Sequence, residues 1–335
     1  MKEIYIITGA AGFLGNNIIR KLQKYEDAEV RALVLPGDKT PSLAGLNCRI
    51  YYGDVTKKDT LKEIFRTEES AAVFVIHCAA VVYIKSKPNP AVYEINVNGT
   101  KNVIEKVLEK NAKLVYVSSV HAIPECPNRQ VITETSDFDP DKVEGDYAKT
   151  KAEIARFILK AVEEKNLNAC IVHPSGIIGP YDFGSSHLTQ LIIDCANGTL
   201  KACVKGGYDF VDARDVAEGI ISACRLGKKG ECYILSNRYF EVRELLDTIT
   251  ETLGIGKIKT VLPMWLARLT APLSEMYYSI LKRPPLYTKY SLYTLTSNAN
   301  FSNEKAKREL GYKTRDIRET VRDTVKWLRE EDRIK

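Results

Sequence analysis

Tyr147 and Lys151 stand four residues apart in the stretch GDYAKTKAE, which spans residues 145–153. The stretch predicts the start of a helix, and residues four apart on a helix lie on one face, one turn above the other. A phenol has an ordinary pKa of about 10, and a nearby ammonium group stabilises the phenolate and lowers that pKa. The spacing therefore favours a tyrosine that exchanges protons with a bound molecule.

The same pair also occurs on solvent-exposed helices without any chemical role, so two further features decide between the interpretations. The helix has a separate apolar stripe for packing, formed by Ala148, Ala152, Ala155, Leu159 and Val162. A serine ends the buried-strand pattern AKLVYVSS at residues 112–119, where a hydroxyl can reach a ligand. The residues alone leave open whether Ser118 or Ser119 is that hydroxyl.

The elements that must position these residues alternate between strands and helices. Hydrophobic strand patterns cover residues 3–8, 29–35, 49–54, 71–80, 112–119 and 168–174. Helical patterns cover residues 13–25, 57–67 and 89–110, and the helix of Tyr147 follows. This order predicts an α/β fold of Rossmann type, with a doubly wound parallel sheet that binds ligands at the carboxyl ends of its strands.

After residue 174 the alternation weakens and helical patterns dominate. We predict a dinucleotide-binding domain from residues 1–173 and 208–236, and a smaller, mostly helical substrate-binding lobe from residues 174–207 and 237–335. Asp215 and Glu218 have the spacing of a capping box at the start of one helix. Pro272 is expected to open a second short helix in the C-terminal lobe.

One C-terminal stretch is rich in large apolar and aromatic residues. Helical spacing relates Trp265, Leu269, Leu273, Met276 and Ile280, and the neighbouring tyrosines are Tyr277, Tyr278, Tyr287 and Tyr290. The pattern favours ordinary core packing. A cover over an apolar substrate and contact with a membrane surface are alternatives, and of these we do not expect membrane contact.

The stretch TGAAGFLG, residues 8–15, falls where the first strand becomes the first helix. Gly9 and Gly12 allow a tight turn close to a pyrophosphate, and Gly15 allows the helix to pack on the sheet. The N–H groups at the start of the helix, from Phe13 and Leu14 onward, then face the anion. This setting indicates a dinucleotide site.

The end of the second strand bears on the choice of cofactor. Enzymes that use NADP often place an arginine there, and enzymes that use NAD an acid. Here Asp38 comes slightly late, Lys39 could reach a phosphate, and no arginine is suitably placed. We favour NAD(H) over NADP(H), with both left open.

Composition and charge bear on nucleic-acid binding, cellular location, membrane spans and metal sites. The net charge of +6 over 335 residues is spread along the chain, so no nucleic-acid site is expected. None of the eight cysteines forms a CxxC pair, which indicates free thiols and a cytoplasmic location. The N-terminus has no signal-peptide pattern, and no apolar run predicts a membrane span. We predict no metal site, and structural roles for His77 and His173.

Several motifs in one order carry a family resemblance: TGAAGFLG, GDVT (53–56), HCAA (77–80), VSS (117–119), YAKTK (147–151), HPSGIIGP (173–180), FVDARDVAEG (210–219) and FSNEKAKRELGY (301–312). Together they resemble the extended short-chain dehydrogenase/reductases of the epimerase/dehydratase branch. The resemblance implies Ser119, Tyr147 and Lys151 as catalytic residues, with Lys151 also holding the nicotinamide ribose. It implies cofactor contacts at Gly9, Gly12, Phe13, Leu14, Gly15, Asp54, Val55, Ala79, Ala80, Asn96, Tyr147, Lys151 and Pro174.

The resemblance also narrows the range of reactions that this chain is expected to catalyse. Sugar-nucleotide dehydratases of this branch have an acid at or after the serine, whereas this chain has SSVHA. Their epimerase relatives usually have asparagine where this chain has Ser175. HPSGIIGP is similar instead to dihydroflavonol reductases and 3-beta-hydroxysteroid dehydrogenases.

We therefore expect an NAD(P)-dependent oxidoreductase that interconverts a carbonyl and a secondary alcohol on a bulky, fairly apolar small molecule. The substrate would be a steroid- or flavonoid-like ketone or an aldehyde. His121 is a candidate for the lining of the substrate pocket. Relatives also lead us to expect a homodimer. The alternatives are a sugar-nucleotide epimerase and a non-catalytic NAD(P)-sensing regulatory protein.

Overall fold

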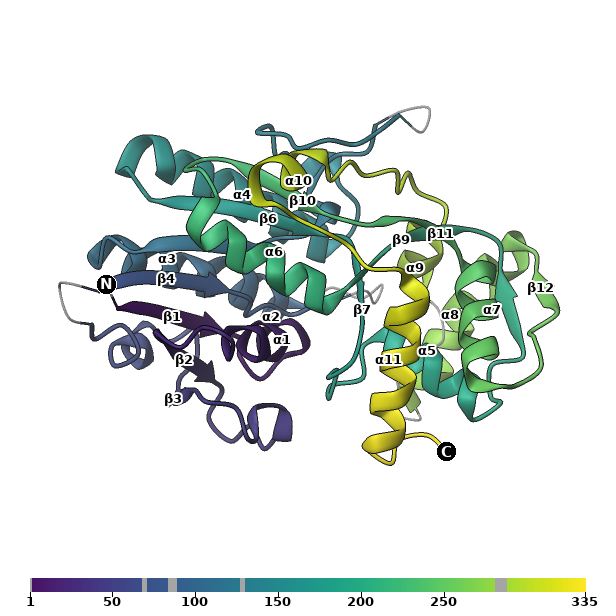
Figure 1. Ribbon diagram of the computed structural model, residues 1–335. Helices are drawn as coiled ribbons and strands as arrows, with labels where there is room; N and C mark the ends of the chain where they lie inside the picture. Colours follow the sequence, from purple (N-terminus) through teal and green to yellow (C-terminus); the bar gives the residue numbers. More distant parts are fainter. Residues whose placement is uncertain (1, 68–70, 84–88, 127–129, 281–287) are drawn as a thin grey trace.

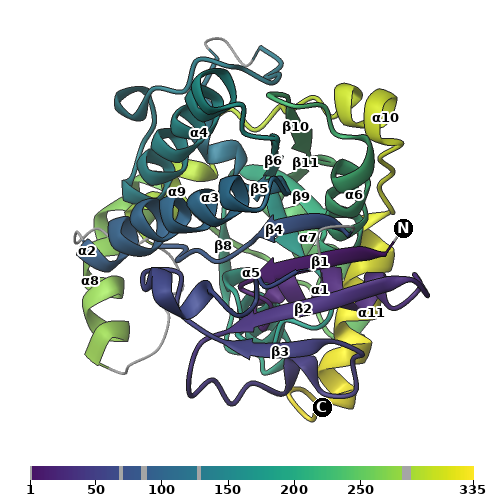
Figure 2. The same ribbon diagram turned by 90° about the vertical axis from the view of Figure 1, so that its left-hand side faces the viewer.

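A seven-stranded parallel sheet forms the centre of the molecule, with the strand order β10-β6-β5-β4-β1-β2-β3 (Figure 2). The computed structural model describes residues 2–67, 71–83, 89–126, 130–280 and 288–335. The strands are β1 (Glu3–Thr8), β2 (Ala28–Val34), β3 (Arg49–Tyr52), β4 (Ala72–His77), β5 (Lys113–Val117), β6 (Ala169–Pro174) and β10 (Cys232–Leu235). The predicted fold class and each of the predicted strands are confirmed.

Two hydrophobic layers cover the sheet because successive strand residues point to opposite faces. Ile4 and Ile6 belong to one buried cluster, and Tyr5 and Ile7 to the other. Helices α3 and α4 pack in the first cluster, and α1 and α6 in the second (Figure 1). Their bounds are α1 (Phe13–Leu22), α3 (Thr100–Glu109), α4 (Asp146–Lys165) and α6 (Ala213–Leu226).

The chain changes direction across the sheet between β1 and β4, which are neighbours in space. In doubly wound sheets the ligand crevice lies at such a point, outside the carboxyl ends of the strands. The turn from β1 into α1 and the residues after β4 and β5 meet at this edge. The sheet therefore gathers the glycine motif and the serine–tyrosine–lysine residues in one place.

Local hydrogen bonds change one predicted helix. Residues 57–67 form only a short 3-10 helix, Lys58–Leu61, followed by turns, so the helix predicted there is wrong. Thr60 Oγ1 is 2.7 Å from the Lys57 carbonyl oxygen and 2.9 Å from Asp54 N, so the threonine is held in a local turn that competes with a helix. The predicted helix over 89–110 is present as α2 (Pro90–Tyr93), a π-helical segment (Glu94–Gly99) and α3.

Most of the remaining elements lie beside the sheet, whereas the helix Glu304–Leu310 packs on the sheet domain next to β10 and α6 (Figure 1). Two small sheets have the orders β11-β9-β7 and β12-β8. Their strands are β7 (Gly176–Ile178), β8 (Ala202–Val204), β9 (Gly207–Asp212), β11 (Arg238–Glu241) and β12 (Thr260–Leu262). The helices are α5 (His187–Ala196), α7 (Val242–Leu253), α8 (Met264–Ile280), α9 (Lys289–Thr294), α10 (Glu304–Leu310) and α11 (Ile317–Glu330). The division into two domains at the stated residues stays a prediction.

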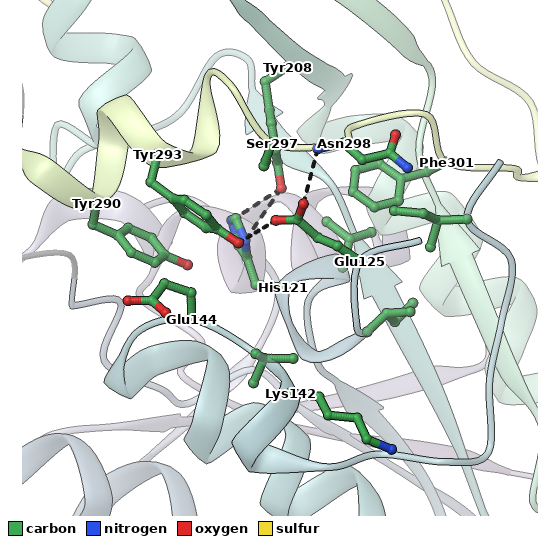
Figure 3. A pocket seen from close by; sticks show the side chains of 14 residues that line it. His121, Glu125, Lys142, Glu144, Tyr208, Tyr290, Tyr293, Ser297, Asn298 and Phe301 are labelled. Carbon is green, nitrogen blue, oxygen red and sulfur yellow. Dashed lines mark hydrogen bonds between the residues drawn. The ribbon is translucent and has the colours of Figure 1, made fainter. Parts of the chain in front are cut away.

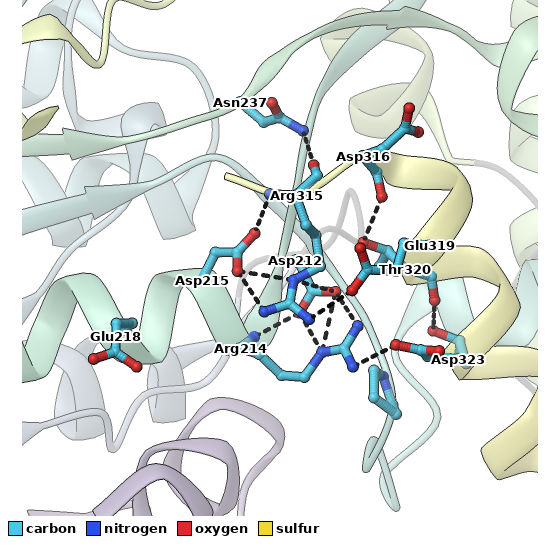
Figure 4. Close-up of polar contacts among 12 residues, drawn as sticks. Asp212, Arg214, Asp215, Glu218, Asn237, Arg315, Asp316, Glu319, Thr320 and Asp323 are labelled. Carbon is cyan, nitrogen blue, oxygen red and sulfur yellow. Dashed lines mark hydrogen bonds and ion pairs between the residues drawn. The ribbon is translucent and has the colours of Figure 1, made fainter. Parts of the chain in front are cut away.

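A charged cluster joins α6 to α11 and replaces the expected capping box (Figure 4). The N-cap of α6 is Asp212, whose carboxylate accepts a hydrogen bond from Arg214 N at 2.7 Å. Asp215 binds Arg315 instead, with 2.7 Å between the carboxylate and the guanidinium. The capping box predicted from Asp215 and Glu218 is therefore wrong, because the helix begins earlier and Asp215 is used in a long-range ion pair.

Helix α8 differs from its expectation in two ways. Pro272 lies inside it, so the predicted start of a second helix at this residue is wrong. The stripe through Trp265 and Leu269 faces solvent and is not the core that the pattern favoured. Tyr287 lies outside the described residues, as do the side chains of Tyr277, Tyr278 and Ile280. No helix in the described part of the chain has both the length and the apolar character needed to cross a bilayer.

Candidate active site

The glycine motif forms a cradle between β1 and α1. Gly9 has φ +64°, and a Cβ on it would lie 2.8 Å from Ala79 N. A Cβ on Gly15 would collide with the carbonyl oxygen of Gly9. Helix α1 begins after Gly12 without a side-chain cap, which leaves its first N–H groups available to an anion. The cradle therefore fits the pyrophosphate of a dinucleotide.

A cavity of about 470 Å³ extends from this cradle. The predicted residues that line it are Gly9, Gly12, Phe13, Leu14, Gly15, Ala80, Ser119, Tyr147, Lys151 and Pro174. The fold thus brings together side chains from the first 15 residues, from the end of β5 and from α4. Asp54, Val55, Ala79 and Asn96 are not part of the lining, and their contacts with a cofactor stay predictions.

Three of these four residues have local roles in the structure. The Asp54 carboxylate accepts hydrogen bonds from Thr56 N at 2.9 Å and from Thr56 Oγ1 at 2.8 Å, which shapes the turn after β3. Val55 is 5% exposed and packs against the backbone of Gly99. Ala79 N donates a hydrogen bond to a side-chain hydroxyl of β1 at 3.2 Å.

Asn96 is fully buried and connects the cavity wall to α4. Its Oδ1 accepts a hydrogen bond from Val81 N at 2.8 Å, and its Nδ2 donates to Val81 O at 3.1 Å. The same Nδ2 donates to Thr150 Oγ1 at 3.2 Å, and that hydroxyl donates to Tyr147 O at 2.8 Å. Asn96 is therefore placed to fix the segment after β4 against the start of the helix that carries Tyr147.

Burial controls the protonation of the tyrosine and the lysine. Burial raises the pKa of Tyr147 to about 12, and a hydrogen bond with Ser119 acts in the opposite direction. The expectation that Lys151 lowers this pKa is wrong for the protein alone, because desolvation outweighs the other effects. Burial also lowers the pKa of Lys151 to about 7. Lys151 Nζ donates to Val117 O at 2.8 Å and lies 5.8 Å from the centre of the Tyr147 ring.

Ser119 is held from two sides at the carboxyl end of β5. Its Oγ accepts a hydrogen bond from His121 N at 3.2 Å. His173 lies 3.0 Å from the Ser119 carbonyl oxygen, so its Nδ1 must carry the proton that it donates. Ser118 Oγ is buried and has no partner among the described residues. Of the two serines only Ser119 affects the pKa of Tyr147, which favours Ser119 over Ser118 as the hydroxyl that works with the tyrosine.

A second cavity of about 240 Å³ shares His121 and Tyr290 with the first (Figure 3). His121 stacks on Tyr208, whose hydroxyl lies 3.2 Å from Nε2 of the histidine. Tyr293 donates a hydrogen bond to Glu125. The hydroxyl of Tyr290 is buried without a partner among the described residues. The two cavities therefore meet at His121, whose ring centre lies 6.4 Å from that of Tyr147.

The aromatic walls come from distant parts of the chain, and one glycine allows their close approach. Tyr208 belongs to β9, and Tyr290 and Tyr293 to α9. Gly145 precedes α4 with φ +88°, and a Cβ on it would lie 2.7 Å from Tyr290 Cε2. Of the lining tyrosines, the sequence singled out only Tyr290, and as part of an aromatic stretch. No local sequence pattern marks Tyr208 or Tyr293, because only tertiary packing brings them to this site.

The comparison with protein families agrees with this geometry. Residues 5–236 match the NAD dependent epimerase/dehydratase family. The chain belongs to this family. The match covers the glycine cradle, the serine, the tyrosine and the lysine, and it confirms the resemblance that the sequence motifs carried.

Three curated relatives of this epimerase/dehydratase family member span most of its length. It is 29% identical to sterol demethylase protein B of Methylococcus capsulatus, over 98% of this chain and 99% of the relative. It is 27% identical to a dihydroflavonol 4-reductase-like protein of Synechocystis sp., over 100% and 97%. It is 27% identical to 3beta-hydroxysteroid-dehydrogenase/decarboxylase isoform 1 of Arabidopsis thaliana, over 92% and 75%.

A solved structure shows the same architecture. The crystal structure of gox2253 superposes with a TM-score of 0.84 at 32% identity, covering 99% of both chains. The relatives with dehydrogenase and reductase names indicate that this member of the epimerase/dehydratase family is an NAD(P)-dependent oxidoreductase.

The residues that line the cavity have the groups needed to hydrogen-bond and protonate a carbonyl oxygen. Ser119 and Tyr147 line the same cavity, and a substrate carbonyl oxygen bound there could accept a hydrogen bond from each hydroxyl. The phenol of Tyr147 would give a proton to that oxygen in reduction and take it back in oxidation. The ammonium form of Lys151 would stabilise the phenolate that remains. A nicotinamide dinucleotide whose pyrophosphate is held by the cradle would supply or accept the hydride.

Proposed function

We propose that this protein interconverts a carbonyl and a secondary alcohol on a bulky, fairly apolar substrate, with a nicotinamide cofactor. The observation that carries the proposal is the placement of Ser119, Tyr147 and Lys151 on the same cavity as the glycine cradle. Each of the three has the chemistry that this reaction needs, and the lowering effect of Ser119 on the pKa of Tyr147 supports their joint action.

The shape of the site supports a substrate larger than a simple aldehyde. The cavities of about 470 Å³ and 240 Å³ adjoin at His121 and Tyr290. A steroid- or flavonoid-like ketone would place its carbonyl near Tyr147 and its far end in the second cavity. Glu125 and the phenols there suit hydroxyl groups at that far end. The names of the sterol and hydroxysteroid relatives support the same substrate class.

We propose NAD(H) as the preferred cofactor, a cytoplasmic location and a homodimer. Asp38 follows β2, and its carboxylate accepts a hydrogen bond from Thr40 N at 2.8 Å; an acid after this strand is the usual partner of the ribose in enzymes that use NAD, which supports NAD(H). The eight cysteines are free thiols, which suits a reducing compartment. Size-exclusion chromatography with light scattering tests the homodimer, and a monomeric mass would contradict it.

The first experiment compares thermal shifts with NAD(H) and NADP(H), because a ligand that binds only the folded chain raises its melting temperature. A screen of steroids, flavonoids, aldehydes and nucleotide sugars then follows the absorbance of the reduced nicotinamide. We expect turnover with a steroid or flavonoid ketone, and a larger thermal shift with NAD(H).

Two outcomes would replace the proposal. Interconversion of nucleotide sugars without net cofactor turnover would identify an epimerase, a chemistry that the family name also covers. Tight cofactor binding without turnover of any compound in the screen would identify a cofactor-sensing protein.

A further inference from the structure

Helix α8 presents large apolar side chains to solvent. Trp265 is 67% exposed, Leu269 68%, Leu273 62% and Met276 59%. Their spacing of three or four residues places them on one face of the helix. A contiguous apolar surface of this kind marks an interaction site, whereas single exposed apolar residues do not.

The opposite face of α8 carries small residues. Ala267 and Ala271 are fully buried against Leu292 of α9. The helix thus buries Ala267 and Ala271 and exposes four of its larger apolar residues, which is the reverse of what stabilises an isolated water-soluble domain. The exposed residues therefore have a use outside the folding of this chain.

The surroundings of this face are basic. Arg268 is exposed and follows Trp265 by three residues, at the border of the face, and Lys257 and Lys259 are exposed in the segment that precedes α8. Residues 254–274 contain no aspartate or glutamate, and Glu275 is the one acidic residue of α8. Lys257 lies 3.4 Å from Asp247, but both side chains are partly or largely exposed, so the pair weakens the positive field only slightly. An apolar stripe that includes a tryptophan and is bordered by lysine and arginine is typical of helices that lie in the interface of an anionic bilayer.

A second copy of the chain is a poorer occupant. A two-fold symmetric contact would place this surface against itself and bring the cations of both copies together. Such like-charge contacts oppose association.

We propose that the α8 face, formed by Trp265, Leu269, Leu273 and Met276, docks on an anionic lipid surface, with Arg268 at its border and Lys257 and Lys259 in the segment that precedes the helix. The lipid covers the apolar stripe, and the cations contact the headgroups. This revises the expectation of no membrane contact, which treated the stripe as core. The docking is peripheral and needs no spanning helix.

The position of the face connects it to the site. Helix α9 packs on α8 through Leu292, and its residues Ser291 and Thr294 line the catalytic cavity. A docked bilayer would lie one helix away from that cavity, where a bulky apolar substrate dissolved in lipid can be taken up. This consequence rests on the proposed function, whereas the docking itself does not.

Cosedimentation with vesicles tests the docking directly. The full chain is mixed with vesicles of phosphatidylcholine and phosphatidylglycerol, and separately with vesicles of phosphatidylcholine alone. We expect sedimentation with the mixed vesicles and much less with the neutral ones. Of the two tryptophans, Trp327 is 4% exposed, so a blue shift of the fluorescence on vesicle addition would report burial of Trp265.

Three substitutions at exposed leucines test whether vesicle binding depends on the α8 face or on exposed apolar residues in general. Leu269→Gln and Leu273→Gln should each weaken vesicle binding roughly tenfold, because each removes one leucine from the apolar contact. Leu226→Gln is the matched control, since Leu226 is 57% exposed at the end of α6, and it should bind as the unchanged protein does.

The results separate this proposal from the proposed enzyme. Failure of the unchanged chain to sediment with anionic vesicles, or equal binding by all three variants, would overturn the docking and leave the catalytic assignment intact. A dimer that Leu269→Gln converts to a monomer, measured by analytical ultracentrifugation without lipid, would assign the face to chain–chain contact and also overturn it. Turnover of a water-soluble carbonyl compound should be equal in all of these variants.

Discussion

At the scale of single residues, desolvation sets the chemistry of the site. Burial raises the pKa of Tyr147 to about 12 and lowers that of Lys151 to about 7. Both shifts disfavour the charged forms, so the protein alone holds a neutral phenol next to an easily deprotonated amine. The neutral phenol is the form that donates a proton to a carbonyl.

The shift at Lys151 gives a pH dependence with a definite sign. Between a pH of about 7 and 10.5 the folded chain holds a neutral amine, whereas the unfolded chain holds an ammonium. The unfolded state then binds more protons, so stability rises with pH across this window, by up to about 1.4 kcal/mol per pH unit. Chemical denaturation without cofactor should show the free energy of unfolding of the unchanged protein rising relative to Lys151→Met. A difference that is constant with pH would contradict the assignment.

At the scale of helices and strands, the sequence predicted those elements that follow from the local pattern of residues. The strands, the glycine turn and the Tyr147 helix follow from periodicity and composition. The helix predicted over 57–67 failed because Thr60 forms competing local hydrogen bonds. The capping box failed because Asp215 has a partner 100 residues away in Arg315. The walls of the second cavity, including Tyr208 and Tyr293, could not be found because only tertiary packing brings them to His121.

The close contact between Gly145 and Tyr290 of α9 gives a prediction at this scale. Gly145→Ala places a Cβ at φ +88° and against the ring of Tyr290, so both the backbone and the ring must shift. We expect a loss of stability of about 1 kcal/mol or more and a higher KM for the carbonyl substrate. Thermal melts and steady-state kinetics measure these effects.

Gly256→Ala is the control, because a Cβ there has open space around it. An unchanged KM in Gly145→Ala would show that the position of Tyr290 does not matter to substrate binding.

At the scale of the whole molecule, a charged cluster holds the C-terminal helix against the sheet domain (Figure 4). The Asp212 side chain is fully buried and lies 2.7 Å from Arg214, which also contacts Asp323 of α11 at 2.5 Å. Arg315 also contacts Asp212, with 3.5 Å between its Nε and the carboxylate. Asp212 therefore both caps α6 and supports the contact between α6 and α11.

Replacing this carboxylate should destabilise the molecule as a whole. Asp212→Ala removes the cap of α6 and leaves two arginines without a shared partner, at a cost of about 3 kcal/mol. Glu319→Gln is the matched control, because this side chain is 51% exposed in its pair with Arg315, and its loss should cost under about 1 kcal/mol. Urea denaturation measures both. Similar stabilities for the two variants would contradict the central place of Asp212.

The most direct measurement for the catalytic account is the transfer of deuterium from a reduced nicotinamide, labelled at its reactive carbon, to the substrate carbonyl carbon. Mass spectrometry of the alcohol product is compared for the unchanged protein and Tyr147→Phe, with cofactor binding checked by thermal shift. We predict labelled alcohol from the unchanged protein, and at least a hundredfold slower formation by a Tyr147→Phe variant that still binds the cofactor. Equal rates of labelled product from both proteins would contradict the role of Tyr147.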